Sequence, residues 1–282
     1  MLARRLPGIM PPMSDEEMLE VTRIYSVAGL LTEKAHLISA RPFRSPHHNV
    51  TMAGLVGGGA GLPRPGEVSL AHLGLLFLDE LCLYHSDALE ALRGPIEDGT
   101  VRIARSGGAV TYPCRFSFVA AMNPCPCGYA GDNGSICRCT TFQLKSYRTK
   151  LSGPLIDRID MQALMARVTK DDLMGPADGE SSAVIRRRVE TARRIQAERY
   201  GTPRITNATA KIDVRKAALT KSARALLGDA VTTRSLTGRG FARVLRVART
   251  AADLEATEEI DDGHIAAALR FRLDLTASQD AA

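Results

Sequence analysis

The chain has 282 residues, 45% of them hydrophobic and 24% charged, which is the composition of a globular protein long enough to bury a full core. It has neither an apolar run long enough for a membrane span nor an apolar signal core near the N-terminus, so we expect a cytoplasmic protein with no membrane partner. The formal charge of +6 is compatible with a polyanionic partner, because clustered Arg and Lys side chains drive salt-dependent binding to nucleic acids.

The first predicted element is a helix that follows a Pro-rich N-terminal loop. Ser14 is its expected N-cap, and Glu17, three residues later, completes a capping box. The buried stripe of this helix is expected to consist of Met18, Val21, Ile24 and Tyr25. Residues 55–74 are rich in Gly and Pro and predict an insertion with only a short strand or helical turn. His47 and His48, just before it, are expected to be structural residues or polyanion contacts rather than metal ligands.

A buried strand is predicted in LGLLFLDE, residues 73–80, where an apolar run leads directly into Asp79 and Glu80. In nucleoside triphosphatases, a strand-terminal Asp orients the water shell of Mg²⁺ and the following Glu polarises the attacking water. The alternative is a strand end whose two acids begin a solvated loop. A second apolar run, FSFVAAMN, ends in Asn123, whose amide is suited to hold such a water, and this favours the catalytic interpretation.

Between these two strands the sequence predicts a short helix and a hairpin. Ser86 is the expected cap of the helix, Leu89 and Leu92 point inward, and Gly94-Pro95 bends or ends it. The alternating residues 101–113, with a turn at 106–108, predict a β-hairpin. This order of elements predicts an α/β fold with functional residues at the carboxyl ends of the strands.

Two arginines extend the candidate site. Arg158, in SGPLIDRID, is either an arginine finger that reaches the γ-phosphate in a neighbouring subunit or a partner in an intramolecular salt bridge. Arg239 lies at the start of a predicted helix, where helix polarity and the guanidinium group both favour phosphate.

Four cysteines, Cys125, Cys127, Cys137 and Cys139, lie within fifteen residues and form two C-x-C pairs separated by nine residues. Four thiolates can close a tetrahedral zinc site, although C-x₂-C is the commoner spacing. The alternative is four partly buried thiols in a loop that folds without metal. A disulfide is not expected in a reducing cytoplasm. Cys82 and Cys114 are expected in or near the core.

The C-terminal part is helical in pattern. We expect an α/β core over residues 1–172, a linker over 173–180, a small all-α domain over 181–276 and a disordered tail over 277–282. The first helix of the all-α domain should begin at Ser181 or Ser182 and end near Tyr200. Later helices are predicted over residues 213–228, 238–254 and 261–274.

In this combination the motifs resemble the magnesium-chelatase-related AAA+ ATPases of the ComM/YifB type. The matching stretches are RPFRSPHHN at 41–49, RPGEVSLAHLGLLFLDEL at 64–81, EALRGPIEDG at 90–99, AAMNPCPCG at 120–128, LSGPLIDRID at 151–160 and RVLRVARTAADL at 243–254. The resemblance implies a P-loop ATPase core followed by a helical lid, with ATP and Mg²⁺ as cofactors.

The resemblance also implies roles for single residues. Asp79 and Glu80 become the Walker B pair, Asn123 the first sensor, Arg158 the finger acting in trans and Arg239 the second sensor. The hairpin would line the pore of a hexameric ring, so Arg105 near its tip is a candidate DNA contact, or else an ordinary solvated turn residue. The family implies ATP-driven branch migration or helicase-type action on branched or single-stranded DNA, in recombination and natural transformation.

One departure from the family pattern concerns the phosphate-binding loop. The sequence contains no Gly-Lys dipeptide, and Met1 stands where the family continues after its Gly-Lys-Thr loop. We therefore expect an N-terminally shortened chain that hydrolyses ATP poorly or not at all. Two alternatives stay open, namely an ATPase subunit that serves magnesium insertion into protoporphyrin, and a non-catalytic fragment that binds DNA or joins rings.

Overall fold

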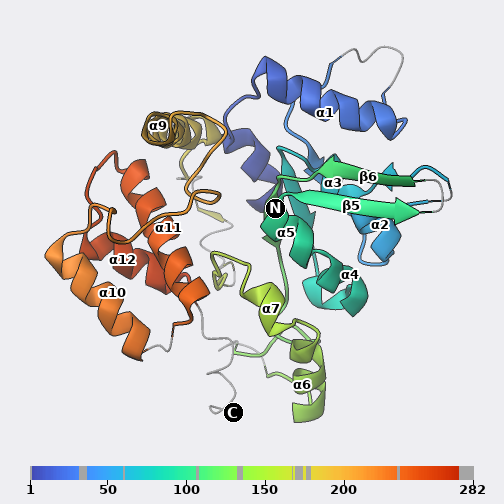
Figure 1. Ribbon diagram of the computed structural model, residues 1–282. Helices are drawn as coiled ribbons and strands as arrows, with labels where there is room; N and C mark the ends of the chain where they lie inside the picture. Colours follow the sequence, from blue (N-terminus) through green and yellow to red (C-terminus); the bar gives the residue numbers. More distant parts are fainter. Residues whose placement is uncertain are drawn as a thin grey trace. The chain divides into compact units, whose positions relative to one another are not determined.

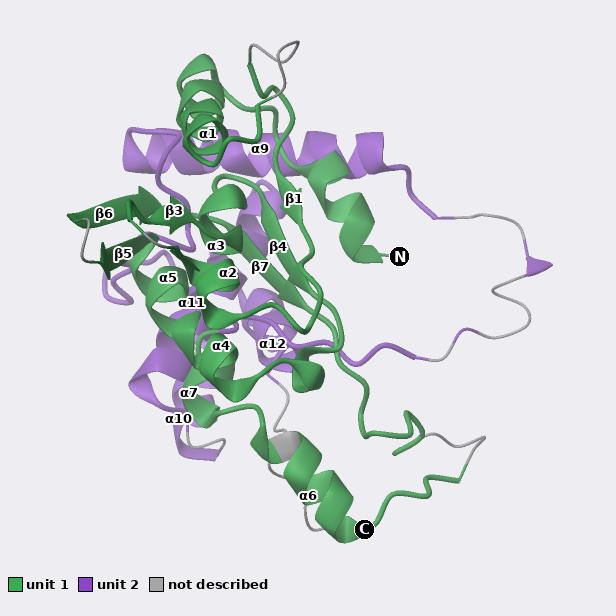
Figure 2. Ribbon diagram, turned by 90° about the vertical axis from the view of Figure 1, so that its right-hand side faces the viewer, with its two compact units in different colours: residues 1–158 green, residues 159–282 purple. Residues whose placement is uncertain are grey.

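The computed structural model describes residues 2–31, 37–59, 61–105, 108–131, 136–166, 168, 174–175, 179–233 and 236–272. The chain divides into two compact units, residues 1–158 and 159–282, drawn in green and purple in Figure 2. Of the linker expected at 173–180, only residues 174–175 and 179–180 are described, and the expected tail at 277–282 lies outside the described residues. None of the helices in the described ranges has the length and apolar character needed to cross a membrane.

Unit 1 begins with the 3-10 helix η1, Leu2–Ile9, and helix α1, Asp15–Val27, shown in blue in Figure 1. The predicted capping box is confirmed, because the Ser14 hydroxyl accepts from the Glu17 N–H and the Glu17 carboxylate accepts from the Ser14 N–H. Of the predicted stripe, Val21 and Ile24 are buried, while Met18 and Tyr25 are partly buried.

A three-stranded parallel sheet forms the centre of unit 1. Its strands are β1, Phe43–Arg44, β4, Leu75–Leu78, and β7, Ser117–Ala120, in the order β1-β4-β7. In β4, Leu75, Leu76 and Leu78 are buried, as the apolar run predicts for a central strand. The pairs Leu75↔Ser117 and Leu78↔Ala120 fix the register between β4 and β7, so these two strands end side by side.

A buried arginine joins the N-terminal segment to this sheet. The Arg41 side chain is 10% exposed and forms an ion pair of 2.9 Å with Glu17. Its guanidinium also donates to the backbone oxygens of Pro11 at 2.5 Å and Leu73 at 2.7 Å. Arg41 thus connects the start of α1 to Leu73, two residues before β4.

The Gly/Pro-rich insertion has more regular structure than the sequence predicted. Helix α2, Met52–Val56, leads into it, and it contains a small antiparallel ladder of β2, Gly57–Gly58, with β3, Arg64–Pro65, and then α3, Glu67–Leu70. Leu55 and Val68 are fully buried in the core of unit 1, which the count of Gly and Pro residues did not reveal. Gly66 permits the close chain approach, since a Cβ there would lie 2.3 Å from the backbone nitrogen of Gly57.

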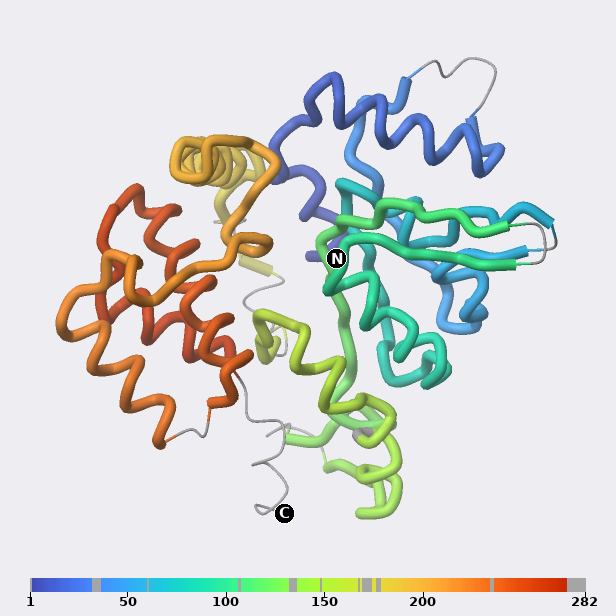
Figure 3. Tube along the Cα trace, in the orientation of Figure 1, coloured from blue at the N-terminus to red at the C-terminus, as the bar shows by residue number. Residues whose placement is uncertain are grey.

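The remaining elements of unit 1 follow β4. They are the 3-10 helix η2, Leu81–Leu83, the helices α4, Ser86–Ala91, and α5, Arg93–Asp98, the hairpin of β5, Thr100–Arg105, with β6, Gly108–Pro113, and then α6, Thr141–Thr149, and α7, Gly153–Ile156. The hairpin is antiparallel as predicted, and its strands run side by side to the edge of unit 1 in Figure 3. Leu89 and Leu92 are buried as expected. The prediction for Ser86 was wrong by one position, because His85 occupies the N-cap and Ser86 is the first helical residue.

Unit 2 is helical. Its helices are α9, Ser182–Tyr200, α10, Lys221–Thr233, α11, Gly238–Leu254, and α12, Asp262–Arg270. Ser181 caps α9, and α11 has the predicted bounds. The helix predicted over 213–228 was misplaced, because Leu219 forms a parallel β-bridge with Ile260 and holds the chain extended there. Thr220 then accepts from the Ala223 N–H and caps α10.

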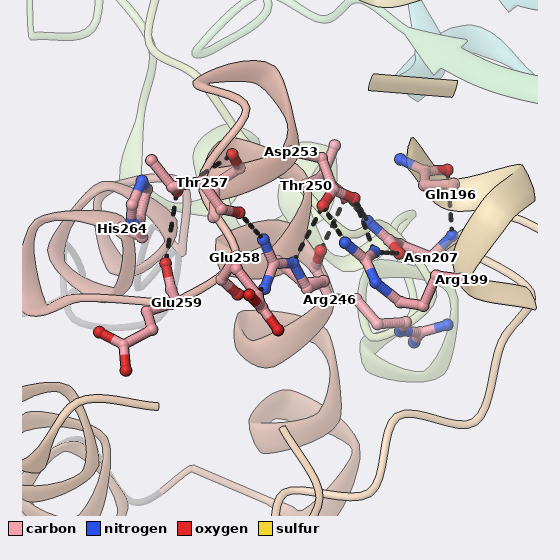
Figure 4. A network of polar contacts seen from close by, with 12 residues as sticks. Gln196, Arg199, Asn207, Arg246, Thr250, Asp253, Thr257, Glu258, Glu259 and His264 are labelled. Carbon is pink, nitrogen blue, oxygen red and sulfur yellow. Dashed lines mark hydrogen bonds and ion pairs between the residues drawn. The ribbon is translucent and has the colours of Figure 1, made fainter. Parts of the chain in front are cut away.

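A buried ion-pair network stabilises unit 2 (Figure 4). The Asp253 carboxylate has no solvent exposure and accepts from Arg199 at 2.5 and 3.0 Å, from Asn207 at 2.7 Å and from Arg249 at 3.1 Å. Burial alone would raise the pKa of Asp253, but these hydrogen bonds and the two guanidinium charges hold that pKa below its ordinary value. The network connects α9 to α11 across more than fifty positions of the sequence.

Candidate active site

Three of the predicted site residues lie at the carboxyl ends of neighbouring strands. Asp79 and Glu80 follow β4 directly, and Asn123 lies three residues after the end of β7. Backbone pairing continues past both strands, because the Ala121 N–H donates to Leu78 at 3.0 Å and the Leu81 N–H donates to Ala121 at 2.9 Å. All three side chains are exposed, so they are accessible to a ligand at this edge of the sheet.

Glu80 has an unusual backbone conformation. Its φ of 51° and ψ of 48° lie in the left-handed region, which costs a residue with a Cβ roughly 1–2 kcal/mol. The Asp79 carboxylate accepts from the Glu80 N–H at 3.0 Å and supports this turn. Local strain that the surrounding structure maintains is common at functional sites, so the conformation supports a special role for Glu80.

A histidine from the segment after β1 lies beside Glu80. The His48 Nδ1 atom is 3.9 Å from a Glu80 carboxylate oxygen, and the His48 ring lies 4.0 Å from the His47 ring. The segment is held in place by Tyr84, whose hydroxyl donates to the Pro46 oxygen at 2.6 Å. Burial, with a further contribution from the Asp79 charge, raises the pKa of Tyr84 to about 12. The sequence did not indicate that His48 belongs to the site, because 32 positions separate it from Glu80.

Arg158 is held within unit 1. It follows α7, donates from Nη1 to the Pro154 oxygen at 2.8 Å and forms an ion pair with Glu97 of α5. Its side chain is only 11% exposed. The intramolecular salt bridge that the sequence offered as an alternative to an arginine finger is therefore present in the single chain.

The other two arginines are exposed. Arg105 is the last residue of β5, next to the hairpin tip, and donates from Nη1 to the Ala104 oxygen at 3.0 Å. Arg239 is the second residue of α11 in unit 2, where Thr237 caps the helix by accepting from the Gly240 N–H at 3.1 Å. Both guanidinium groups are accessible to an anionic partner.

The six cysteines fall into two groups. Cys82 and Cys114 are buried in the core of unit 1 as predicted, and burial raises the pKa of the Cys114 thiol to about 12. The other four lie in the segment between β7 and α6, and their Sγ atoms gather within 4.8 Å of one another. In this group, hydrogen bonds from backbone N–H groups of Tyr129 and Arg138 lower the pKa of Cys127 to about 6.

Comparison with known families accounts for nearly all of the chain. The family described as magnesium chelatase, subunit ChlI, matches residues 1–173, and the family of the C-terminal part of the same subunit matches residues 179–272. The chain belongs to the magnesium chelatase ChlI family. Its parallel sheet, inserted hairpin and helical C-terminal unit correspond to a partial AAA+ core with a helical lid, as the sequence predicted.

Proteins similar to this chain match almost all of it. An uncharacterised protein of Mycobacterium tuberculosis is 46% identical over 275 residues, which cover 96% of this chain and 54% of the relative. The competence protein ComM of Haemophilus influenzae is 40% identical over 276 residues, and the protein YifB of Escherichia coli is 38% identical over 275 residues. Each alignment covers 96% of this chain and 53% of the relative. The chain thus spans about half the length of the curated relatives it matches, and the ComM/YifB resemblance is confirmed.

Proposed function

We propose that this ChlI-family chain carries the hydrolytic part and the lid of a ComM-like AAA+ ATPase that acts on DNA. The observation that supports this most is the arrangement of Asp79, Glu80 and Asn123 at two adjacent strand ends, joined by backbone pairing beyond the strands. Open α/β sheets bind ligands at this edge. An acidic pair beside an amide suits the hydrolysis of a nucleoside triphosphate that is bound with Mg²⁺.

In this proposal each residue at the sheet edge has a separate task. Asp79 orients the water shell of Mg²⁺, which neutralises phosphate charge when it is bound. Glu80 accepts the proton of the attacking water, and Asn123 orients that water. His48, at 3.9 Å from Glu80, helps to hold the carboxylate in position.

The two remaining arginines supply positive charge. Arg158 of one subunit acts as the finger toward the nucleotide of its neighbour, which requires it to exchange Glu97 for a phosphate. Arg239, at an exposed helix start, contacts phosphate from the lid. A finger that acts in trans needs an assembly of subunits, and we propose the hexameric ring of the family. The exposed Arg105 on the hairpin then contacts DNA in the pore.

The phosphate-binding loop is the part that these 282 residues do not supply, since they contain no Gly-Lys dipeptide. Without its lysine and its nest of N–H donors, nucleotide binding should be weaker by several kcal/mol. We therefore propose that the 282-residue chain alone hydrolyses ATP poorly or not at all. Association with DNA does not depend on that loop.

The test uses the 282-residue chain and the longest in-frame product of its gene. We expect DNA-stimulated ATP hydrolysis only from a product that includes a Gly-Lys-Thr loop, and loss of hydrolysis in its Glu80→Gln variant. ATP hydrolysis by the 282-residue chain that is abolished by Glu80→Gln would contradict the proposed inactivity of that chain. Hydrolysis by the longer product that survives Glu80→Gln would contradict the proposed role of Glu80. Absence of salt-dependent binding to branched or single-stranded DNA would contradict the proposed partner.

A second candidate function follows from the printed description of the family, which names a magnesium chelatase subunit. In that case the chain would drive ATP-dependent magnesium insertion into protoporphyrin together with other subunits. The 40% identity with a protein named for competence favours the DNA proposal. Magnesium insertion in a reconstituted chelatase assay, combined with no binding to DNA, would reverse this preference.

A further inference from the structure

Four cysteine thiols gather at a place that the proposed nucleotide site does not use. They lie on the segment between β7 and α6, in two C-x-C pairs. The Sγ atom of Cys125 is 3.4 Å from that of Cys127 and 3.7 Å from that of Cys137, and the Sγ atoms of Cys127 and Cys137 are 3.6 Å apart. With Cys139, all four sulfur atoms lie within 4.8 Å of one another.

These separations fit one tetrahedral ion. Zinc–sulfur bonds of about 2.3 Å in tetrahedral geometry place neighbouring sulfur atoms about 3.8 Å apart. A disulfide requires about 2.05 Å, much less than the distances in this cluster. An iron–sulfur cluster has thiolates that stand around several metal atoms, and sulfur atoms this close leave room for a single ion. We propose that Cys125, Cys127, Cys137 and Cys139 form a structural zinc site with four thiolate ligands.

The backbone around the cluster supports negatively charged sulfur. The Ala130 N–H donates to the Cys125 sulfur at 3.3 Å, and the N–H groups of Tyr129 and Arg138 donate to Cys127. Such N–H···S hydrogen bonds orient thiolate ligands and share their charge. Four thiolates around a divalent cation carry a net charge of −2. Arg138 stands between the last two ligands in the sequence and is exposed, and it adds a positive charge to this segment.

The segment has little apolar packing to order it without a metal. Cys125 is fully buried, yet in the described part of unit 1 it is not a member of the apolar core that contains Cys82 and Cys114. Ile136 is 88% exposed and Tyr129 is 41% exposed, so the large apolar side chains beside the ligands contribute little burial. A structural metal commonly supplies the missing folding free energy in such cases.

The zinc site lies close to Asn123 in the sequence and affects the order of the chain there. The cluster begins two residues after Asn123 and ends two residues before α6, whose Tyr147 side chain hydrogen bonds to the Asn123 backbone and to Cys82. Closing the segment with zinc therefore fixes α6 against the strand end that carries Asn123. Zinc binding itself is independent of the proposed function, and only this effect on Asn123 rests on it.

The test measures metal in the 282-residue chain, purified without chelators and in the absence of nucleotide and DNA. Plasma mass spectrometry should find about one zinc ion per chain. The double variant Cys137→Ser/Cys139→Ser should contain almost none. The matched control Cys114→Ala removes a thiol that lies outside the cluster and should retain zinc at the wild-type level.

Two further measurements use the wild-type chain, so they test the zinc site even if the double variant folds poorly. Titration of the wild-type chain with an organic mercurial should release the zinc as four thiols react. Hydrogen exchange of residues 121–131 and 136–147 should become faster when zinc is removed, while exchange of α1 stays unchanged. A wild-type zinc content near zero, iron in place of zinc, or equal zinc in the double variant would each overturn the proposal. Absence of salt-dependent DNA binding by the zinc-bound chain would count against the proposed function and leave the zinc site intact.

Discussion

The strongest prediction for stability concerns Asp253, the fully buried carboxylate at the centre of the network in unit 2. Asp253→Asn keeps the size of the side chain but removes the charge that two guanidinium groups share. Arg199 is 30% exposed and can regain water, whereas the Arg249 side chain is only 7% exposed. Arg249 would retain the carbonyl oxygens of Thr257 and Glu258, both at 2.5 Å, and at most the new amide oxygen, and none of these acceptors carries a charge.

The loss of stability follows from the buried Arg249 guanidinium, which would no longer have an opposite charge beside it. Breaking a buried pair by removing one partner costs about 3–5 kcal/mol. A domain is typically stable by only about 5–15 kcal/mol, so unit 2 should approach the limit of its stability. For amides of α9 and α11 that exchange only when this unit unfolds, the hydrogen-exchange protection factor should fall by about 2 to 3.5 powers of ten. Hydrogen–deuterium exchange of the full chain reports them separately from unit 1.

Two comparisons decide whether the reasoning holds. Asp229→Asn makes the same chemical change at an exposed position of α10 and should shift stability by less than about 0.5 kcal/mol. In an Arg249→Met background, Asp253→Asn should cost much less, because no buried guanidinium remains to be stranded. Two results would refute the role of the unpaired Arg249 charge. One is a loss of stability in Asp253→Asn as small as that in Asp229→Asn, and the other is an equal loss when Asp253→Asn is made in the Arg249→Met background.

The same carboxylate predicts a dependence on pH. The pKa of Asp253 is lower in the folded chain than its ordinary value of 3.8, so the contribution of Asp253 is fully present above that value. As pH falls below 3.8 and through the lower folded pKa, the wild-type chain should lose its advantage over Asp253→Asn. Urea denaturation of both proteins between neutral and acid pH measures that difference. A gap that widened on acidification would contradict the stated direction of the pKa shift.

Three smaller changes test other parts of the fold. Gly74→Ala would place a Cβ 2.0 Å from the Pro42 oxygen and should lower the melting temperature strongly, whereas Gly228→Ala has open space and should not. Glu80→Gly should be about 1 kcal/mol more stable than Glu80→Ala in urea denaturation, since only glycine relieves the left-handed strain and both variants lose the carboxylate. Thr220→Ala should cost about 1 kcal/mol by the same measurement, because α10 loses its cap.

Local signals in the sequence were sufficient to predict a helix or strand when the residues that determine it lie close together in the sequence. Ser14 with Glu17 predicted the start of α1, and the apolar run before Asp79 predicted β4. The bounds of α11 were also correct, since a capping Thr237 precedes it and nothing interrupts its apolar stripe. In each case the determining contacts lie within a few residues of one another.

Long-range contacts determined the parts that the sequence did not reveal. The helix expected from 213 begins only at Lys221 because Leu219 pairs with Ile260, forty-one positions later. His48 lies beside Glu80 because β1 and β4 are parallel neighbours, and no spacing in the sequence encodes that pairing. The burial of Asp253 likewise depends on Arg199 from another helix.

Two charged groups of the candidate site already contact another side chain of the same chain. Arg158 pairs with Glu97, which is 52% exposed, and Glu80 has His48 at 3.9 Å. When Arg158 exchanges Glu97 for a phosphate, the half-exposed Glu97 carboxylate can regain water, which limits the cost of breaking the pair. Under the proposed function, the salt bridge and the arginine finger are therefore successive states of one side chain rather than competing interpretations. In that proposal, the salt bridge holds Arg158 at the end of α7 until a neighbouring subunit presents a phosphate.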